Sequence, residues 1–332
     1  MRPEVAIVYN EPCTCAYVPW EEKAVLGVLE TVDAVYSALV GLGYPISVVP
    51  LLPPVERAGD VLKALRVDLI FNLFEGFDGY PETEAVVAGI ISELGLVYTG
   101  CPPSALSLAL DKSKAKDILS MAGIATPGFQ VLTPETLSTF NLRYPCIVKP
   151  CGEDASHGLT EESVVNDADQ LVRQVAKVSE LFGGRALVEE FVDGREFNVT
   201  VLGGNSPIVL PISEIVYSLP PGMPNLLTFS AKWEPQSFYF EHTGVVCPAE
   251  IAEETREQIA DVALRAFQLF GCSGYARLDL RQNGGEPQVL EVNPNPDISP
   301  GTGSARQAQA AGMTYIQFID RIMQFALEKS NL

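Results

Sequence analysis

The sequence has few of the residues on which several kinds of chemistry depend. It contains only two histidines, His157 and His242, and no Ser, Cys or His set that makes a convincing catalytic triad. Its 42 acidic residues outnumber 22 basic ones, which gives a formal net charge of -20. No basic stripe stands out, and a chain of this charge repels phosphate backbones. Nucleic acid is therefore not an expected partner.

Long apolar runs are also missing. No stretch of about 18 apolar residues occurs, and the start MRPEVAIVYNEPC lacks a charged segment followed by a long apolar one. The seven cysteines have no CxxC spacing, which favours reduced thiols, and Cys13 and Cys15 have no nearby residue that completes a metal site. We expect a cytoplasmic protein with no membrane partner.

The N-terminal third alternates short apolar segments with helical patterns. Strands are expected at 5–9, 46–50, 68–72 and 96–98, and helices at 21–42, 55–65 and 82–94. This alternation is typical of a parallel sheet with helices on its faces. No GxGxxG follows the first strand, so we expect no dinucleotide site. The Cys101-Pro102-Pro103 step is the predicted boundary of this α/β unit.

Beyond that boundary, strands are followed mostly by strands. Helices are expected at 112–122, 167–181, 249–270 and 314–327, and strands at 145–150, at 186–192 and in the segments EFNVTVLGG and PIVLPISEIVY. This order is typical of an α+β arrangement. A chain of 332 residues is long enough for two or three domains.

The segment GYARLDLRQNGGEPQVLEVNPNP indicates a hairpin around an Asn-Gly-Gly turn at 283–285. Pairing about this turn places Asp279 opposite Glu291 and Arg277 opposite Asn293. Like charges directly across a ladder are destabilising, so the two carboxylates need a compensating cation. On this reasoning, Glu291→Gln should leave folding intact or improve the stability of the metal-free protein.

The same hairpin face suits a hard metal ion. Asp279, Glu291 and Asn293 supply three oxygen ligands of the kind that Mg²⁺ takes together with phosphates and water. Arg277 lies two residues from Asp279 on the same face, where it can stabilise an oxyanion. The hairpin therefore predicts metal-assisted chemistry.

Three lysines and a glycine-containing loop accompany the hairpin in the second part of the chain. Lys149 ends an apolar strand and meets the loop 151–158, whose backbone N–H groups can approach an anion. Lys112, in ALDKSKAK, and Lys232, in FSAKWEP, are weak signals alone. Lysines, a flexible loop and a carboxylate-bound metal are the parts that hold a triphosphate, so together they indicate ATP chemistry.

This ordered set of motifs resembles the ATP-grasp superfamily and, within it, the D-alanine-D-alanine ligase family. The resemblance runs from GLVYTGCPPSALSLALDKSKAKDIL through IVKP, VEEFVDGREF and SAKW to GYARLDL, LEVNPNP and RQAQAAGMTY. It implies an ATP-grasp fold of mixed α/β and α+β class, with ATP held between two sheet-bearing domains. The implied domains are an N-terminal α/β domain (1–102), a central ATP-binding domain (103–190) with phosphate loop 151–158, and a C-terminal ATP-grasp domain (191–332) with metal hairpin 275–293.

The resemblance also implies a reaction and roles for single residues. ATP and a carboxylate form an acyl phosphate, which an amine then attacks, with release of ADP. Relatives of this family are commonly homodimers. The residues implied to contact ATP are Lys112, Lys149, Glu153, Ser156, Glu189, Val192, Glu196 and Lys232. The residues implied to bind two Mg²⁺ ions, with Mn²⁺ as a substitute, are Asp279, Glu291 and Asn293, and Arg277 is implied to stabilise the tetrahedral intermediate.

Several positions depart from the family pattern at the substrate end. Ala155 and Trp233 stand where the family has serine and tyrosine, and they cannot rebuild the hydrogen-bonded group that holds the first D-alanine. Glu75 takes the place of a histidine after the third strand. Asp297 replaces a glycine near the second substrate's carboxylate, which a fixed anion repels. We assign Glu75, Asp297 and Thr302 to the amino-acid substrates and expect D-alanine to be a poor one.

Three functions therefore stay open. The first is a ligase that joins an amino acid amine to a phosphate-activated carboxylate, of which D-alanyl-D-alanine synthesis is one version. The second is a ligase that forms an imine between serine or threonine and a cyclohexenone, as in mycosporine-like amino acid synthesis. The third is a non-catalytic nucleotide-binding regulatory protein, which has less need of a complete metal set with its arginine.

Overall fold

The computed structural model describes residues 2–12, 22–77, 79–152, 158–204 and 206–330. Its strands are β1 (Val5–Asn10), β2 (Ile46–Leu51), β3 (Leu69–Leu73), β4 (Phe129–Leu132), β5 (Cys146–Pro150), β6 (Val164–Val165), β7 (Ala186–Glu190), β8 (Arg195–Gly203), β9 (Ile208–Val209), β10 (Ser213–Tyr217), β11 (Thr243–Val246), β12 (Gly274–Gln282) and β13 (Gln288–Pro294). Its α-helices are α1 (Glu22–Gly41), α2 (Val55–Ala64), α3 (Thr83–Glu93), α4 (Pro103–Leu110), α5 (Lys112–Met121), α6 (Ala168–Leu181), α7 (Phe229–Trp233), α8 (Phe238–Glu241), α9 (Glu253–Leu269), α10 (Gly303–Ala310) and α11 (Tyr315–Ser330). No helix in the described part of the chain is both long and apolar enough to cross a membrane.

The N-terminal sheet is parallel, with strand order β2-β1-β3. Because alternate strand residues face opposite sides, Val5 and Ile7 pack toward α1 and α11, whereas Ala6 and Val8 pack toward α2 and α3. The expected parallel α/β unit is therefore confirmed. The segment 96–98, expected as a full strand, contributes only the bridge between Tyr98 and Ile70.

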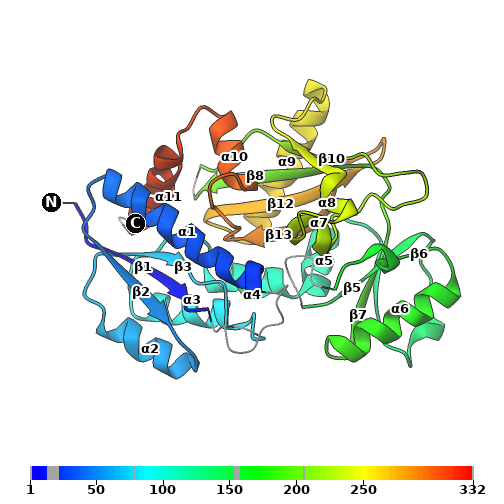
Figure 1. Cartoon of the computed structure of the whole chain (residues 1–332), viewed down its shortest axis with the longest axis horizontal. Helices are drawn as coiled ribbons and strands as arrows, with labels where there is room; N and C mark the ends of the chain where they lie inside the picture. Colours follow the sequence, from blue (N-terminus) through cyan, green and yellow to red (C-terminus); the bar gives the residue numbers. More distant parts are fainter. Residues whose placement is uncertain (1, 13–21, 78, 153–157, 205, 331–332) are drawn as a thin grey trace.

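Two antiparallel sheets follow. The middle sheet has the order β4-β7-β5-β6 and packs against α6, and the C-terminal sheet has the order β11-β10-β8-β12-β13, with β9 paired to β8. Each of the three sheets takes all its strands from one of the three predicted domain ranges. In Figure 1 the N-terminal sheet and the middle sheet lie at opposite ends of the molecule, and α5 lies between the middle sheet and the hairpin β12–β13.

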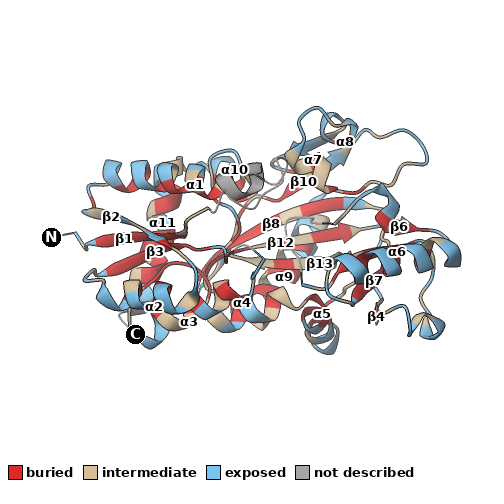
Figure 2. Ribbon diagram, turned by 60° about the horizontal axis from the view of Figure 1, so that its bottom comes forward, coloured by how far each residue is buried: buried red, intermediate tan, exposed pale blue. Residues whose placement is uncertain are grey.

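The hydrophobic cores cross these sheet boundaries. Helix α11, at the C-terminal end of the chain, places Phe318 and Ile322 in the same cluster as Ile7 of β1 and Tyr275 of β12. Figure 2 shows the long strands β8 and β12 buried along most of their length, while the outer faces of the helices are exposed. The N-terminal unit therefore packs directly on the sheet that carries the predicted metal hairpin.

Some expected boundaries were wrong, and proline explains two of them. The long helix begins at Glu253 rather than at 249, with Ala252 as its extended N-cap residue. The segment PIVLPISEIVY forms two strands instead of one, separated around Pro211, which cannot donate to a ladder. The stretch after Pro102 is helix α4 rather than a break in the pattern, and Pro103 occupies its first turn, where a missing N–H costs nothing.

Candidate active site

The predicted hairpin forms with the expected register. Strands β12 and β13 pair antiparallel, with Asp279 opposite Glu291 and Arg277 opposite Asn293. The register shifts directly after Asp279, so that Leu280 pairs with Val289. A bulge of this kind bends the strand locally and re-aims the adjacent side chains. The pairing on which the sequence argument depends is thus confirmed.

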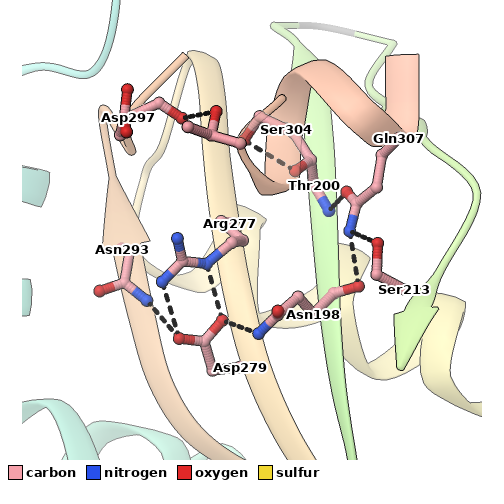
Figure 3. A network of polar contacts seen from close by, with 10 residues as sticks. Asn198, Thr200, Ser213, Arg277, Asp279, Asn293, Asp297, Ser304 and Gln307 are labelled. Atoms are coloured by element: carbon pink, nitrogen blue, oxygen red, sulfur yellow. Dashed lines mark hydrogen bonds and ion pairs between the residues drawn. The ribbon is translucent and has the colours of Figure 1, made fainter. Parts of the chain in front are cut away.

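Asp279 is held by hydrogen bonds from three sides (Figure 3). Its Oδ1 accepts from Arg277 Nε at 2.8 Å and from Asn198 Nδ2 at 2.7 Å. Its Oδ2 accepts from Arg277 Nη2 at 2.9 Å and from Asn293 Nδ2 at 3.1 Å. Burial disfavours the charged form of Arg277, but the carboxylate of Asp279 outweighs this effect and raises the pKa of the guanidinium. Asp279 and Arg277 therefore form one fixed ion pair.

Glu291 is neutralised by lysines instead. Lys112 Nζ pairs with Glu291 Oε1, and Lys112 is positioned by Asp111, whose side chain caps α5 by accepting from Lys114 N at 3.2 Å. Burial alone would raise the pKa of Glu291, but Lys112 and Lys149 outweigh it, so that the pKa falls to about 2. The cation that the facing carboxylates require is therefore supplied by the protein itself.

The predicted ATP lysines lie around the same hairpin. Lys149, at the end of β5, pairs with Glu189 Oε2, and its pKa is lowered to about 8, chiefly by burial. Burial also lowers the pKa of Lys232, and Arg277 adds to this effect, while Asp279 and Glu291 oppose it. The backbone N–H of Lys112 donates to Cys151 O at 3.3 Å, which brings the start of α5 to the predicted phosphate loop.

Glu196 and Val192 are tied together by one arginine. Arg281 donates to Glu196 Oε2 from Nη2 at 2.6 Å and from Nε at 3.0 Å, and to the Val192 carbonyl from Nη1 at 2.8 Å. Tyr217 Oη also donates to Glu196 Oε2, at 2.8 Å. The turn before Glu196 needs Gly194, because a Cβ there would lie 2.2 Å from the backbone oxygen of Gln282. These contacts fix the segment that the sequence assigns to adenine and ribose.

The predicted substrate residues gather at another point, beside the N-terminal sheet. Glu75 and Asp297 line a cavity of about 10 Å³, the size that one water-sized group needs. Both side chains are exposed, yet crowding by protein atoms and the charge of Asp297 raise the pKa of Glu75 to about 7. Asp297 Oδ1 accepts from Ser299 N at 2.8 Å and from Ser299 Oγ at 2.6 Å. Thr302 is turned into the loop, since its Oγ1 donates to Ser299 O at 2.7 Å.

Not every predicted residue can be placed, and some residues at the site were not predicted. Glu153 and Ser156, together with Ala155, lie outside the described residues. Arg281 was missed although it continues the alternation of Arg277 and Asp279 along β12. Lys116 was missed although it lies four residues after Lys112 on α5, and hence on the same face of the helix.

The hairpin residues fit a hard metal ion through their donor atoms. In the described part of the chain no three His, Cys, Asp or Glu side chains group as a metal site, since the hairpin offers two carboxylates and one amide. Both oxygens of Asp279 already accept hydrogen bonds. Glu291 Oε2 accepts none from the described residues, so its lone pairs can meet a cation. The metal assignment stays a prediction.

Comparisons with known proteins agree on the family. Residues 118–324 match the family model described as D-ala D-ala ligase C-terminus. A D-alanine-D-alanine ligase of Desulforudis audaxviator is 30% identical over 89% of this chain and 92% of its own length. An uncharacterised protein of Sinorhizobium fredii is 35% identical over 78% of this chain and 74% of its own length. The solved structure of Bacillus anthracis D-alanine-D-alanine ligase complexed with ATP aligns with a TM-score of 0.74 at 22% identity and covers 99% of each chain.

Proposed function

Because the chain belongs to the D-alanine-D-alanine ligase family of the ATP-grasp superfamily, which makes it an ATP-dependent ligase, we propose that its reaction passes through an acyl phosphate and releases ADP. The observation that carries this proposal is the hairpin itself. Its two carboxylates lie among three cations, Lys112, which is buried, and Lys149 and Arg277, which are partly buried. A site of this kind neutralises a transferring phosphoryl group.

ATP takes over contacts that the protein now makes internally. The carboxylate of Glu189 holds Lys149, and that of Glu291 holds Lys112. A triphosphate presents more negative charge than a single carboxylate, so both lysines can exchange their partner for phosphate oxygens. Glu189 Oε1 is buried and accepts no hydrogen bond from the described residues, although Lys116 lies beside it as an ion-pair partner. That oxygen is an acceptor for a donor on the nucleotide, and Val192 and Glu196 are assigned, with Glu189, to the adenine and ribose.

The metal residues complete the phosphate end of the site. Asp279, Glu291 and Asn293 would hold two Mg²⁺ ions, which Mn²⁺ could replace because all three residues offer oxygen donors. The metal supplies neutralisation of the charge on the transferring phosphoryl group. Release of Lys112 from Glu291 frees both a metal ligand and a phosphate ligand in the same exchange.

The residues of this chain then serve two chemical steps. In the first, a substrate carboxylate oxygen attacks the γ-phosphorus of ATP, which forms the acyl phosphate and releases ADP. In the second, an amine attacks the carbonyl carbon, the C–N bond forms, and phosphate leaves with the former carboxylate oxygen. Arg277 is fixed by Asp279 and offers its guanidinium to the oxyanion of the tetrahedral intermediate.

The acceptor differs from a simple α-amino acid. Asp297 places a negative charge where the family has a glycine, and Glu75 adds a second acid beside it. Trp233, where the family has a tyrosine, keeps an indole N–H that is buried without a partner among the described residues. This position can therefore donate to a substrate but cannot accept from one. We infer that D-alanine alone is a poor substrate and that another acceptor is preferred.

Isotope transfer tests the proposed reaction. The protein is incubated with ATP, Mg²⁺ and a pool of D- and L-amino acids whose carboxyl oxygens are ¹⁸O. Phosphate carrying one ¹⁸O, together with an amide product, is the expected result, because the carboxylate oxygen leaves with the phosphoryl group. ADP with unlabelled phosphate would indicate hydrolysis by water and contradict the proposal. Transfer that requires a cyclohexenone with labelled oxygen would favour the imine-forming ligase instead.

A further inference from the structure

Glu189 is shared by two lysines that differ in their surroundings. Its side chain is 1% exposed, and its two oxygens pair separately with Lys116 Nζ and Lys149 Nζ. The Lys116 side chain is 2% exposed and the Lys149 side chain 13%. One buried carboxylate thus faces two cations, of which the proposed function requires only Lys149 at the phosphates.

Lys116 is fixed by a second contact. Its Nζ donates to Thr126 Oγ1 at 2.8 Å, and Thr126 Oγ1 in turn donates to the backbone oxygen of Val289 at 2.8 Å. Val289 belongs to β13, the strand that carries Glu291. Lys116 therefore links Glu189 to the metal hairpin through one hydroxyl. Within the described part of the chain Lys149 has no comparable tether, since its polar side-chain partner there is Glu189.

Several charges act on Lys116 and Lys149, the two lysines that share Glu189. Burial lowers the pKa of Lys116 well below its ordinary value, Lys149 and Lys112 lower it further, and Glu291 opposes them. Arg281 and Glu196 act on Lys149 from the C-terminal sheet. The lowered pKa means that these surroundings disfavour the ammonium form of Lys116, whereas its ion-pair contact with Glu189 Oε1 favours the ionised form of both groups.

We propose that Lys116 is a positioning residue that sets nucleotide base specificity by keeping Glu189 an ionised hydrogen-bond acceptor after Lys149 has moved to the phosphates. This inference rests on the proposed role of Glu189 at adenine. An ionised carboxylate only accepts hydrogen bonds, and the 6-amino group of adenine is a donor. Inosine triphosphate carries a 6-oxo group there, which only accepts. The pair Lys116–Glu189 therefore selects ATP over ITP.

The loss of Lys116 has a specific consequence. When Lys149 binds phosphate, Glu189 would be buried with no cation, and a carboxylate in that position takes up a proton. A protonated carboxyl group has an O–H donor, which suits the 6-oxo group of ITP. Lys116→Met is therefore expected to weaken ATP binding and strengthen ITP binding, which a general loss of stability would not do.

Equilibrium binding of ATP and ITP with Mg²⁺, without amino acids, tests the inference. We expect the unmodified protein to prefer ATP by about tenfold or more, and Glu189→Gln and Lys116→Met each to reduce that ratio by about tenfold. Lys114→Met is the matched control, because Lys114 lies on the same helix with a 72% exposed side chain, and it should keep the ratio. If Lys116→Met does not fold, Thr126→Val is measured in its place. That variant removes the hydroxyl that accepts from Lys116 Nζ and should shift the ratio in the same direction.

The outcomes separate this inference from the proposed function. The role of Lys116 is overturned if the ratio of ATP to ITP affinity changes in Glu189→Gln but not in Lys116→Met. Where Lys116→Met does not fold, an unchanged ratio in Thr126→Val has the same meaning. Either result leaves Glu189 at the base. An unchanged ratio in Glu189→Gln overturns the assignment of Glu189 and the inference with it. The ligase reaction is measured separately, through isotope transfer.

Discussion

Replacing Glu291 by glutamine decides which electrostatic effect dominates at the hairpin. In the sequence, only Asp279 lies across the ladder from Glu291, so the variant is expected to be as stable as the original or more so. In the structure, Asp279 is already paired with Arg277, and Glu291 faces Lys112, Lys149 and Lys232. The attraction to these lysines therefore outweighs the repulsion, and we expect Glu291→Gln to destabilise the metal-free protein.

The magnitude follows from the pKa. A carboxyl pKa of about 2, against an ordinary 4.5, corresponds to about 3 kcal/mol at 1.36 kcal/mol per unit. Because the Glu291 side chain is 29% exposed and the lysines can rearrange, we expect a loss of about 1 to 3 kcal/mol. The folded-state pKa is depressed, so this stabilisation is fully present above about pH 4.5 and is lost as the pH falls toward 2.

Thermal unfolding in EDTA, without nucleotide, measures the effect. For a domain of 150–250 residues, 1 kcal/mol shifts the midpoint by about 2 to 4 °C. The deficit of the variant should be present near pH 6 and shrink below pH 4.5, and it should also shrink toward pH 8 as Lys149, one of the partners of Glu291, loses its proton. Lys112→Met combined with Glu291→Gln should cost less than the sum of the single changes, because the pair is removed together.

An exposed ion pair provides the control. Lys177 and Glu162 pair at 3.0 Å with side chains 45% and 76% exposed. Glu162→Gln should therefore change stability by less than about 1 kcal/mol. A higher unfolding temperature for Glu291→Gln than for the original protein would mean that repulsion between Asp279 and Glu291 outweighs the attraction of Glu291 to the lysines.

Three further predictions concern other parts of the site. Asp297→Gly should shift the preference in ADP release toward acceptors with a free α-carboxylate, because it removes the charge that repels them; an unchanged preference order would count against this. The pKa of Glu75 is raised to about 7, so its ionisation lowers the free energy of unfolding as the pH rises from 4.5 through 7. Glu75→Gln should therefore unfold at a higher temperature than the original protein at pH 8 but not at pH 4.5. An equal unfolding midpoint of the two proteins at pH 8 would contradict the raised pKa. Arg281→Met leaves Glu196 buried without its cation and should cost about 3 to 5 kcal/mol in urea unfolding, whereas Arg256→Met, at an exposed pair, should cost less than about 1 kcal/mol.

Local patterns were enough to predict the elements that carry the chemistry. The alternation of 275–281 and 288–293 and the glycine turn between them predicted the hairpin and the partners of Arg277 and Asp279, which the structure confirms, but not the register shift directly after Asp279. The strand-helix alternation of the first 102 residues likewise predicted the parallel sheet. Both features depend on residues close together in the chain, where periodicity and turn chemistry decide the outcome.

Charge partners were harder to predict because they come from distant segments. The pairing of Glu291 with Lys112 joins residues 179 positions apart, and no spacing rule connects them. Lys116 and Arg281 could have been found by extending the helix face of Lys112 and the strand face of Asp279. Which carboxylate each would meet depends on how three sheets pack, and local periodicity does not specify that packing.

Release of ADP from ATP, measured over single D- and L-amino acids with and without cyclohexenones, is the most direct test of the proposed ligase reaction. We expect ADP release that depends on particular amino acids and matches the amount of a condensed product of corresponding mass, with D-alanine alone slow. ADP release that stays at the background rate of hydrolysis with every compound would contradict it and indicate a nucleotide-binding protein without turnover.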